Sequence, residues 1–266
     1  MPWIPIPIIA EICNIFTDAD SRTRKDFTKG LVVNERDYVS RFLTLTSYPR
    51  ITGGGKYNGL YAVSCSTDTT ERKHGIDAVF VFKYKKGIKI GVCECKIEKE
   101  KFDNGRFTKQ LAKQADLVKK QPEIVVFEMF FHKEFRDPFE PDLSTICTLH
   151  QINNFIEEKR GGKKPKVWKL KDLEDLFNHL KSKTPGKYSI DSLLDAILNC
   201  EQGEFLQDMS SNYSQNSQNS FVDDTINLAR SIINNDVSDL PLESYRNTYG
   251  IDAISIIDFE AILRYQ

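Results

Sequence analysis

Residues 75–96 read GIDAVFVFKYKKGIKIGVCECK, two runs of apolar and β-branched residues separated by a short polar stretch. This pattern is typical of a β-hairpin, with strands at about 77–83 and 88–97 and a turn that Gly87 favours. The hairpin decides the fold, because the charged residues of the stretch fall at the end of its otherwise apolar strands.

The pairing register of this hairpin brings two acids together. A four-residue loop at 84–87 pairs Lys83 with Ile88, and counting outward sets Asp77 directly opposite Glu94. Like charges directly opposed across two strands destabilise a sheet. The register therefore predicts a compensating positive charge at this point, and a divalent metal ion is the simplest candidate.

Alternation along the second strand sorts its side chains between the two faces of the sheet. Glu94 and Lys96 share one face, whereas Cys93, Cys95 and Ile97 point to the other. One face thus offers Asp77, Glu94 and Lys96 as a cluster, and the other is apolar enough to enter a core. The alternative is an exposed hairpin with a surface ion pair between Glu94 and Lys96.

The arrangement of a Gly-x-Asp strand, a turn and an apolar strand ending in Glu-x-Lys resembles the PD-(D/E)xK nuclease superfamily, which has the restriction-endonuclease-like fold. Asp77 matches the family's Asp, and 94–96 matches its Glu-x-Lys, although Ile76 replaces the family's Pro. The resemblance implies Mg²⁺- or Mn²⁺-dependent hydrolysis of phosphodiester bonds in DNA, with RNA left open. It implies that Asp77, Glu94 and the Cys95 carbonyl hold the metal and that Lys96 assists catalysis.

An upstream helix over about 31–45 supplies a further acid. Its spacing places Glu35 on the same face as Val39 and Phe42, and Asn34 is a suitable N-cap. The family resemblance implies an acidic residue on a helix before the core sheet, so Glu35 is a candidate catalytic residue and metal ligand. The alternative is an acid favoured by the helix N-terminus alone.

A helix over 106–120 carries two glutamines on or near its apolar stripe, Gln110 and Gln114. In the resembling family a glutamine on the helix after Glu-x-Lys often points at the site, which makes both residues candidates. The alternative is that they are ordinary helix-forming surface residues.

Basic residues suggest where a phosphate backbone would lie. The segment 159–171 holds seven basic residues and no acidic one, so it is a candidate to contact a phosphate backbone. The loop before Asp77 and the helix over 106–120 also carry basic residues that are candidates for phosphate contacts. Solvated surface charge is the alternative for all of them. The candidate nucleic-acid-binding residues are Arg72, Lys73, Lys109, Lys113, Lys163, Lys164, Lys166 and Trp168, whose ring is expected to stack on a base.

The element order predicts an α/β fold with a mixed sheet flanked by helices. We expect a nuclease-like domain over 1–202 with its core at about 31–131, where the order helix, three strands, helix, strand matches the family. A polar Ser/Asn/Gln-rich linker over 203–220 and an acidic, mostly helical extension over 221–266 follow. The stretch 17–30 is expected to be a loop or short helix.

Composition describes an ordinary globular chain of 266 residues, with 40% hydrophobic and 28% charged residues. From Gly203 onward there are three Arg and ten Asp or Glu, so this part carries −7 and the remainder +6 of the total −1. A basic body with an acidic tail fits a polyanion-binding protein. Six cysteines without Cys-x-x-Cys spacing indicate a reducing, cytoplasmic compartment, and the proline-broken N-terminal run predicts no membrane helix.

The sequence is also compatible with two functions other than that of a nuclease. The chain is either a nuclease, or a catalytically inactive module that keeps the fold to bind nucleic acid or protein. It is also consistent with an effector-type interaction protein secreted into a host cell, in which the acidic C-terminal segment binds a protein partner. A homodimer is a further possibility.

Overall fold

The computed structural model of this protein describes residues 4–50, 55–64, 74–97, 105–131, 143–183, 186–207, 220–235 and 239–264. Its helices are α1 (Ile6–Thr28), α2 (Glu35–Ser47), α3 (Arg106–Lys120), α4 (Leu149–Arg160), α5 (Leu170–Lys183), α6 (Ile190–Leu198), α7 (Phe221–Ile233), α8 (Asp239–Tyr249) and α9 (Phe259–Arg264). Its strands are β1 (Leu60–Ser64), β2 (Ala78–Tyr84), β3 (Gly87–Ile97), β4 (Val125–Phe131), β5 (Thr145–Thr148), β6 (Leu206–Gln207) and β7 (Ala253–Asp258).

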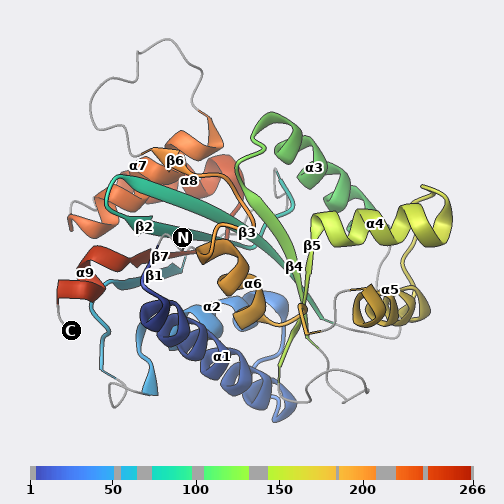
Figure 1. Cartoon of the computed structure of the whole chain (residues 1–266), viewed down its shortest axis with the longest axis horizontal. Helices are drawn as coiled ribbons and strands as arrows, with labels where there is room; N and C mark the ends of the chain where they lie inside the picture. Colours follow the sequence, from blue (N-terminus) through green and yellow to red (C-terminus); the bar gives the residue numbers. More distant parts are fainter. Residues whose placement is uncertain are drawn as a thin grey trace.

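A mixed β-sheet with helices on both faces organises the molecule (Figure 1). Six strands follow the order β1-β7-β2-β3-β4-β5, and the two-residue β6 pairs with the start of β3. The pairs β2–β7 and β3–β4 are parallel, and β1–β7, β2–β3 and β4–β5 are antiparallel. The predicted α/β class and the order helix, three strands, helix, strand are confirmed by α2, β1, β2, β3, α3 and β4.

The hairpin has the register that its sequence predicts. Lys83 pairs with Ile88, and Tyr84 pairs with Gly87, so the loop is shorter than the four residues expected. Ala78 pairs with Cys93, and the amide of Asp77 donates to the Cys93 carbonyl at 2.8 Å. The paired register ends at Ala78, and the Asp77 amide also bonds Cys93, so the predicted opposition of Asp77 and Glu94 does not form as a regular pair.

The extension at residues 221–266 is mostly helical, as predicted, with α7, α8 and α9, but residues 253–258 are not helical. These residues form β7, an interior strand that lies between β1 and β2. All six of its residues are buried, because both faces of the strand are covered. A short apolar run of this kind is compatible with a helix or a strand, and long-range pairing decides between them. Residues 208–219 of the expected linker lie outside the described residues.

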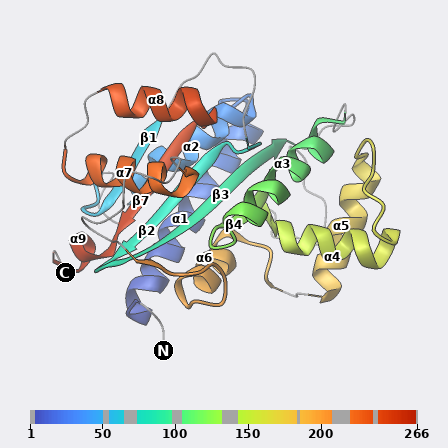
Figure 2. The same cartoon turned by 90° about the horizontal axis from the view of Figure 1, so that it is seen from above.

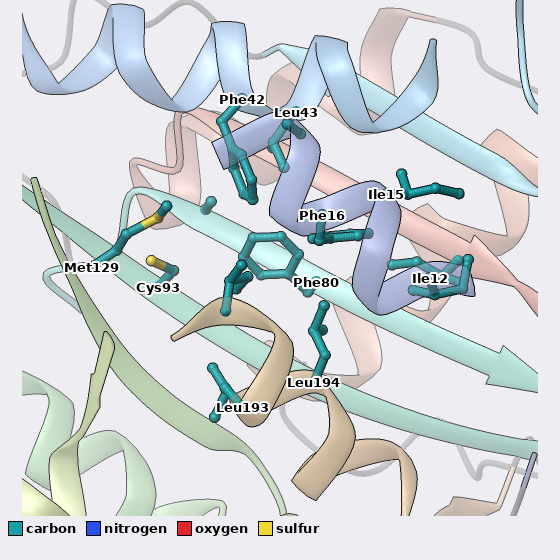
Figure 3. Packing of buried hydrophobic residues seen from close by; sticks show 14 of the residues in the cluster. Ile12, Ile15, Phe16, Phe42, Leu43, Phe80, Cys93, Met129, Leu193 and Leu194 are labelled. Carbon is teal, nitrogen blue, oxygen red and sulfur yellow. The ribbon is translucent and has the colours of Figure 1, made fainter. Parts of the chain in front are cut away.

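Two hydrophobic cores fill the spaces above and below the sheet. Residues of α1, α2 and α6 pack on the face that carries Cys93, Cys95 and Ile97. Figure 3 shows Phe16 of α1 and Leu194 of α6 against Phe80 of β2. Residues of α3, α4, α5, α7 and α8 pack on the opposite face. Figure 2 shows α3 over the β3–β4 side of this second face, with α7 and α8 over the β1–β7–β2 side.

The N-terminal stretch also differs from expectation. Residues 17–28 do not form a loop or short helix but belong to α1, which is 23 residues long. A proline at the first turn does not interrupt a helix, because the first amides have no intrahelical acceptor. The buried face of α1, including Ile12 and Phe16, continues through the charged region at Ala19, Thr23 and Phe27. No described helix combines the length and apolarity needed to cross a bilayer.

Candidate functional site

Four acidic residues lie side by side in, or just before, the neighbouring strands β7, β2, β3 and β4. Glu94 of β3 pairs with Glu128 of β4, and Asp77, just before β2, bonds β3 through its amide to Cys93 and through its carboxylate to the Cys95 amide. Asp252 precedes β7, and its amide donates to the Asp77 carbonyl at 2.9 Å. Asp77, Glu94 and Glu128 are fully buried and Asp252 is 2% exposed. Four acidic side chains are thus gathered away from solvent.

Asp77 ends the regular pairing of β2 with β3. Its carboxylate Oδ2 accepts a hydrogen bond from the Cys95 amide at 2.6 Å. Its own carbonyl oxygen is directed the other way, toward β7, where it accepts from the amides of Asp252 and Ala253. A side-chain oxygen thus replaces the main-chain acceptor that β2 would otherwise offer to Cys95. This exchange fixes the Asp77 carboxylate at the end of the hairpin.

Glu94 is held by two side chains. Its Oε1 accepts hydrogen bonds from the Lys96 ammonium and from the Gln110 amide of α3. Lys96 is only 8% exposed, so the expected alternative of a surface ion pair is wrong. Burial opposes the charged form of Lys96, but Glu94, Glu35 and Glu128 together outweigh it and raise the pKa of the ammonium. Lys96 is therefore protonated at neutral pH in this structure.

Glu35 lies at the first residue of α2, as its sequence position predicts. The Asn34 side chain caps this helix by accepting from the Asp37 amide at 2.9 Å. Glu35 is half-buried, and its Oε1 accepts from the Ile97 amide at 3.2 Å. Val39 and Phe42 are buried below it. The helix thus brings a further acid to the end of β3, close enough to contribute to the pKa of Lys96.

The two glutamines of α3 have different surroundings. Gln110 donates to Glu94, which puts it in the site. Gln114 is fully buried, and its amide donates to the Gly75 carbonyl at 2.9 Å. Gly75 has a positive φ of +66°, and an added Cβ there would lie 3.1 Å from Gln110. Gln114 therefore holds the chain just before Asp77, so the surface alternative is wrong for this residue.

Glu128 and Asp252 were missed in the sequence, although one signal was present. Glu128 is the only charged residue in the apolar run 124–131, where an isolated charge in a strand buried on both faces is unusual. Burial raises the pKa of Glu128 to about 8, Glu94 adds to the rise, and Lys96 opposes it. Asp252 forms an ion pair with Arg36 of α2 at 3.3 Å. The position of Asp252 depends on β7, a strand that the local sequence pattern did not predict.

The donor set fits a hard divalent cation in its chemistry. Asp77 and Glu94 offer carboxylate oxygens, and the Cys95 carbonyl points to the same side of β3 as the Cys95 amide, which donates to Asp77. Mg²⁺ prefers such oxygen ligands and retains several waters, so two side chains suffice. Among the described residues, no three His, Cys, Asp or Glu side chains are grouped so that they could hold a metal ion. A main-chain carbonyl and water would have to complete the shell.

The predicted nucleic-acid-binding residues fall into three groups. Arg72 and Lys73 lie outside the described residues. Lys109 and Lys113 are exposed on α3. The remaining lysines are exposed in the loop between α4 and α5, which packs on the start of α3 through a hydrogen bond from Thr108 Oγ1 to the Pro165 carbonyl at 2.5 Å. These lysines are Lys163, Lys164 and Lys166. Exposed lysines of α3 and of this loop therefore belong to neighbouring parts of one surface.

Trp168 corrects the prediction of base stacking. The side chain is fully buried, and its ring packs edge-on against Phe107 with 5.2 Å between centroids. Phe155 of α4 lies on another side at 6.4 Å. An aromatic residue inside a basic segment anchors that segment to the core here, because burying a large ring outweighs the local polarity.

Comparison with known proteins found no match among family models, curated proteins or solved structures.

Proposed function

We propose that this protein is a metal-dependent nuclease that hydrolyses phosphodiester bonds, with DNA as the expected substrate and RNA as the second. The observation that carries the proposal is that the Asp77 carboxylate bonds the Cys95 amide, between the two residues of the buried Glu94–Lys96 pair, at the end of the β2–β3 hairpin. A strand pair that assembles two buried acids and a lysine has the charges needed to handle a cation and a phosphate together.

Each residue has a distinct part in this proposal. Asp77, Glu94 and the Cys95 carbonyl would hold the Mg²⁺ or Mn²⁺ ion, with Glu35 near enough to complete the shell through water. When bound, such an ion polarises the scissile phosphate and lowers the pKa of a coordinated water. The protonated Lys96 offsets negative charge on the phosphate and orients the attacking water. Gln110 fixes the orientation of Glu94.

The proposal is tested by incubating linear, circular and single-stranded DNA and RNA with the protein in Mg²⁺, Mn²⁺ or EDTA. Cleavage is expected with either metal and is expected to stop in EDTA. Asp77→Ala and Lys96→Ala should abolish it while circular dichroism remains native. Lys86→Ala is the matched control, since it removes an exposed charge at the opposite end of the same hairpin. Cleavage that survives EDTA or either site variant would refute the proposal.

A second candidate function is a nuclease-fold module that binds nucleic acid without cleaving it. Burial favours it, because Asp77 and Glu94 are inaccessible and Lys96 and Gln110 both occupy Glu94 Oε1. In this case DNA binding, measured by fluorescence anisotropy, would occur without turnover in any metal, and Asp77→Ala would leave the affinity unchanged.

A further inference from the structure

A partly open cavity lies between α4 and α5, and the proposed site does not use it. The two helices lie side by side at the β5 edge of the sheet (Figures 1 and 2). The cavity has a volume of about 510 Å³ and is lined by residues of the last turns of α4 and of one stripe of α5. Pockets for small ligands measure roughly 300–1,000 Å³. This cavity is therefore large enough for a ligand of nucleotide size.

His179 is the polar group buried most deeply in this cavity. The side chain is 5% exposed, lines the cavity, and its Nδ1 has no hydrogen-bond partner among the described residues. Phe155 lies against the imidazole, with 5.6 Å between ring centroids. A buried polar atom without a partner costs free energy, so its presence beside a cavity indicates a ligand or a water that supplies the missing bond.

Two cations at the rim provide a place for negative charge. Arg160 is oriented by its contact with Asp172 and lies 5.9 Å above the Phe155 ring. Lys159 is exposed and forms no ion pair with a described residue. Burial lowers the pKa of His179, Glu158 opposes this effect, and Lys183 and Lys159 add to it, so Lys159 lies near the imidazole. A guanidinium, an ammonium and an imidazole that converge on one cavity are suited to the oxygens of a phosphate group.

The remaining lining groups are suited to another part of the same ligand. Asp175 would repel a phosphate, whereas its carboxylate accepts hydrogen bonds from hydroxyl or amino groups. Asn178, also in the lining, offers both a donor and an acceptor. Inorganic phosphate would leave both of these residues unused. A phosphate attached to a sugar and a base would engage the whole lining.

We propose that the cavity between α4 and α5 is a binding site for a nucleoside phosphate, which is either a free nucleotide or the terminal nucleotide of a strand. Lys159, Arg160 and His179 bind the phosphate, and Asp175 and Asn178 bind the nucleoside. Binding of a strand terminus rests on the proposed nuclease function, whereas binding of a free nucleotide does not. The basic segment 159–171 begins at this cavity, so a strand held there continues along the lysines that follow.

Binding is measured on the full chain in EDTA, where metal-dependent cleavage is absent. Calorimetry is used with a nucleoside 5′-monophosphate, the unphosphorylated nucleoside and inorganic phosphate, and anisotropy with single-stranded oligonucleotides with and without a 5′-phosphate. The nucleotide is expected to bind at least tenfold more tightly than either fragment. A preference for the 5′-phosphorylated oligonucleotide identifies a strand terminus as the source, and its absence beside nucleotide binding identifies a free nucleotide. If neither the nucleotide nor the phosphorylated strand binds, the proposal is overturned whatever the cleavage assay shows.

Lys159→Ala and Lys181→Ala form a matched pair, because both remove an exposed charge from these helices but Lys181 does not line the cavity. Lys159→Ala should weaken nucleotide binding at least tenfold and Lys181→Ala less than twofold. Equal losses would show general electrostatic attraction and would overturn the site. His179→Gln, checked for a native melting temperature, should also weaken binding. If that variant does not fold, the lysine pair alone decides the question.

Discussion

The amide of Asp252 donates to the carbonyl oxygen of Asp77 at 2.9 Å, and this hydrogen bond joins β7 to the hairpin that carries the candidate site. It places a carboxylate from the C-terminal region beside one from the middle of the chain. Asp252 is also paired with Arg36, the residue after Glu35 on α2. Three separate segments therefore meet at Asp77.

Asp252→Asn should lower metal-dependent cleavage about tenfold to hundredfold, the usual effect of removing a group that supports a metal ligand. The variant keeps the size and the main-chain bond of Asp252 and removes its charge. Arg36→Gln breaks the same ion pair but leaves the acid in place. A loss of equal size in both variants would mean that Asp252 acts through the ion pair alone.

Gln110 and Gln114 should separate activity from stability. Gln110→Ala removes a hydrogen bond to Glu94 and is expected to reduce cleavage with little effect on unfolding. Gln114→Ala leaves the buried Gly75 carbonyl without its donor and should cost about 1–3 kcal/mol of stability. Urea unfolding and cleavage rates of both variants provide the check. If Gln110→Ala instead lowers stability and Gln114→Ala lowers only cleavage, the roles assigned to the two residues are wrong.

Glu128 should make the stability of the metal-free protein depend on pH. Its pKa is about 8 when folded, against an ordinary value of 4.5. The folded protein therefore holds this proton more tightly than the unfolded chain, and the stability it provides is lost as pH rises from 4.5 through 8. Glu128→Gln removes this titration. The free energy of unfolding, measured with urea in EDTA at pH 5, 7 and 9, should fall more steeply with pH in the wild type than in Glu128→Gln. An equal fall in the two proteins would contradict the raised pKa of Glu128.

Lys89 should be required for stability rather than for activity. Its ammonium is buried and donates to the carbonyls of Ile197, Gln202 and Gly203 at 2.8, 3.0 and 3.1 Å, which ties β3 to the end of α6. Lys89→Met would leave three carbonyls without this donor and is expected to cost about 2–5 kcal/mol. Chemical denaturation measures the loss, with the exposed Lys86→Met as the control. A native-like midpoint would show that water replaces the ammonium.

Local patterns were sufficient for the central part of the fold. The register of the β2–β3 hairpin, which pairs Lys83 with Ile88, follows from alternation and a short turn, both of which depend on neighbouring residues. The helix over 106–120 was predicted with the bounds that α3 has, because its apolar stripe and its polar flanking residues indicate the same start and end. Glu35 followed from the same helical spacing.

What local patterns did not provide depends on contacts between distant segments. The sequence of β7 is a short apolar run that is compatible with both a helix and a strand. Only its pairing with β1 and β2 makes it a strand. Asp252 could not be placed without that pairing. Trp168 lies in a basic segment whose composition suggested an exposed ring, but Phe107 and Phe155 cover it from two helices.

The position of β7 between β1 and β2 also affects the order of assembly during synthesis. The first strands leave the ribosome long before their interior neighbour exists, so β1 and β2 have no partner on those edges until residues 253–258 emerge. Pairings so distant in the chain form slowly, since a long loop must close first. We expect a nascent chain to lack Asp252 and the bonds of the Asp77 carbonyl to β7 until residues 253–258 have been made, so the activity proposed for this site is acquired only afterwards.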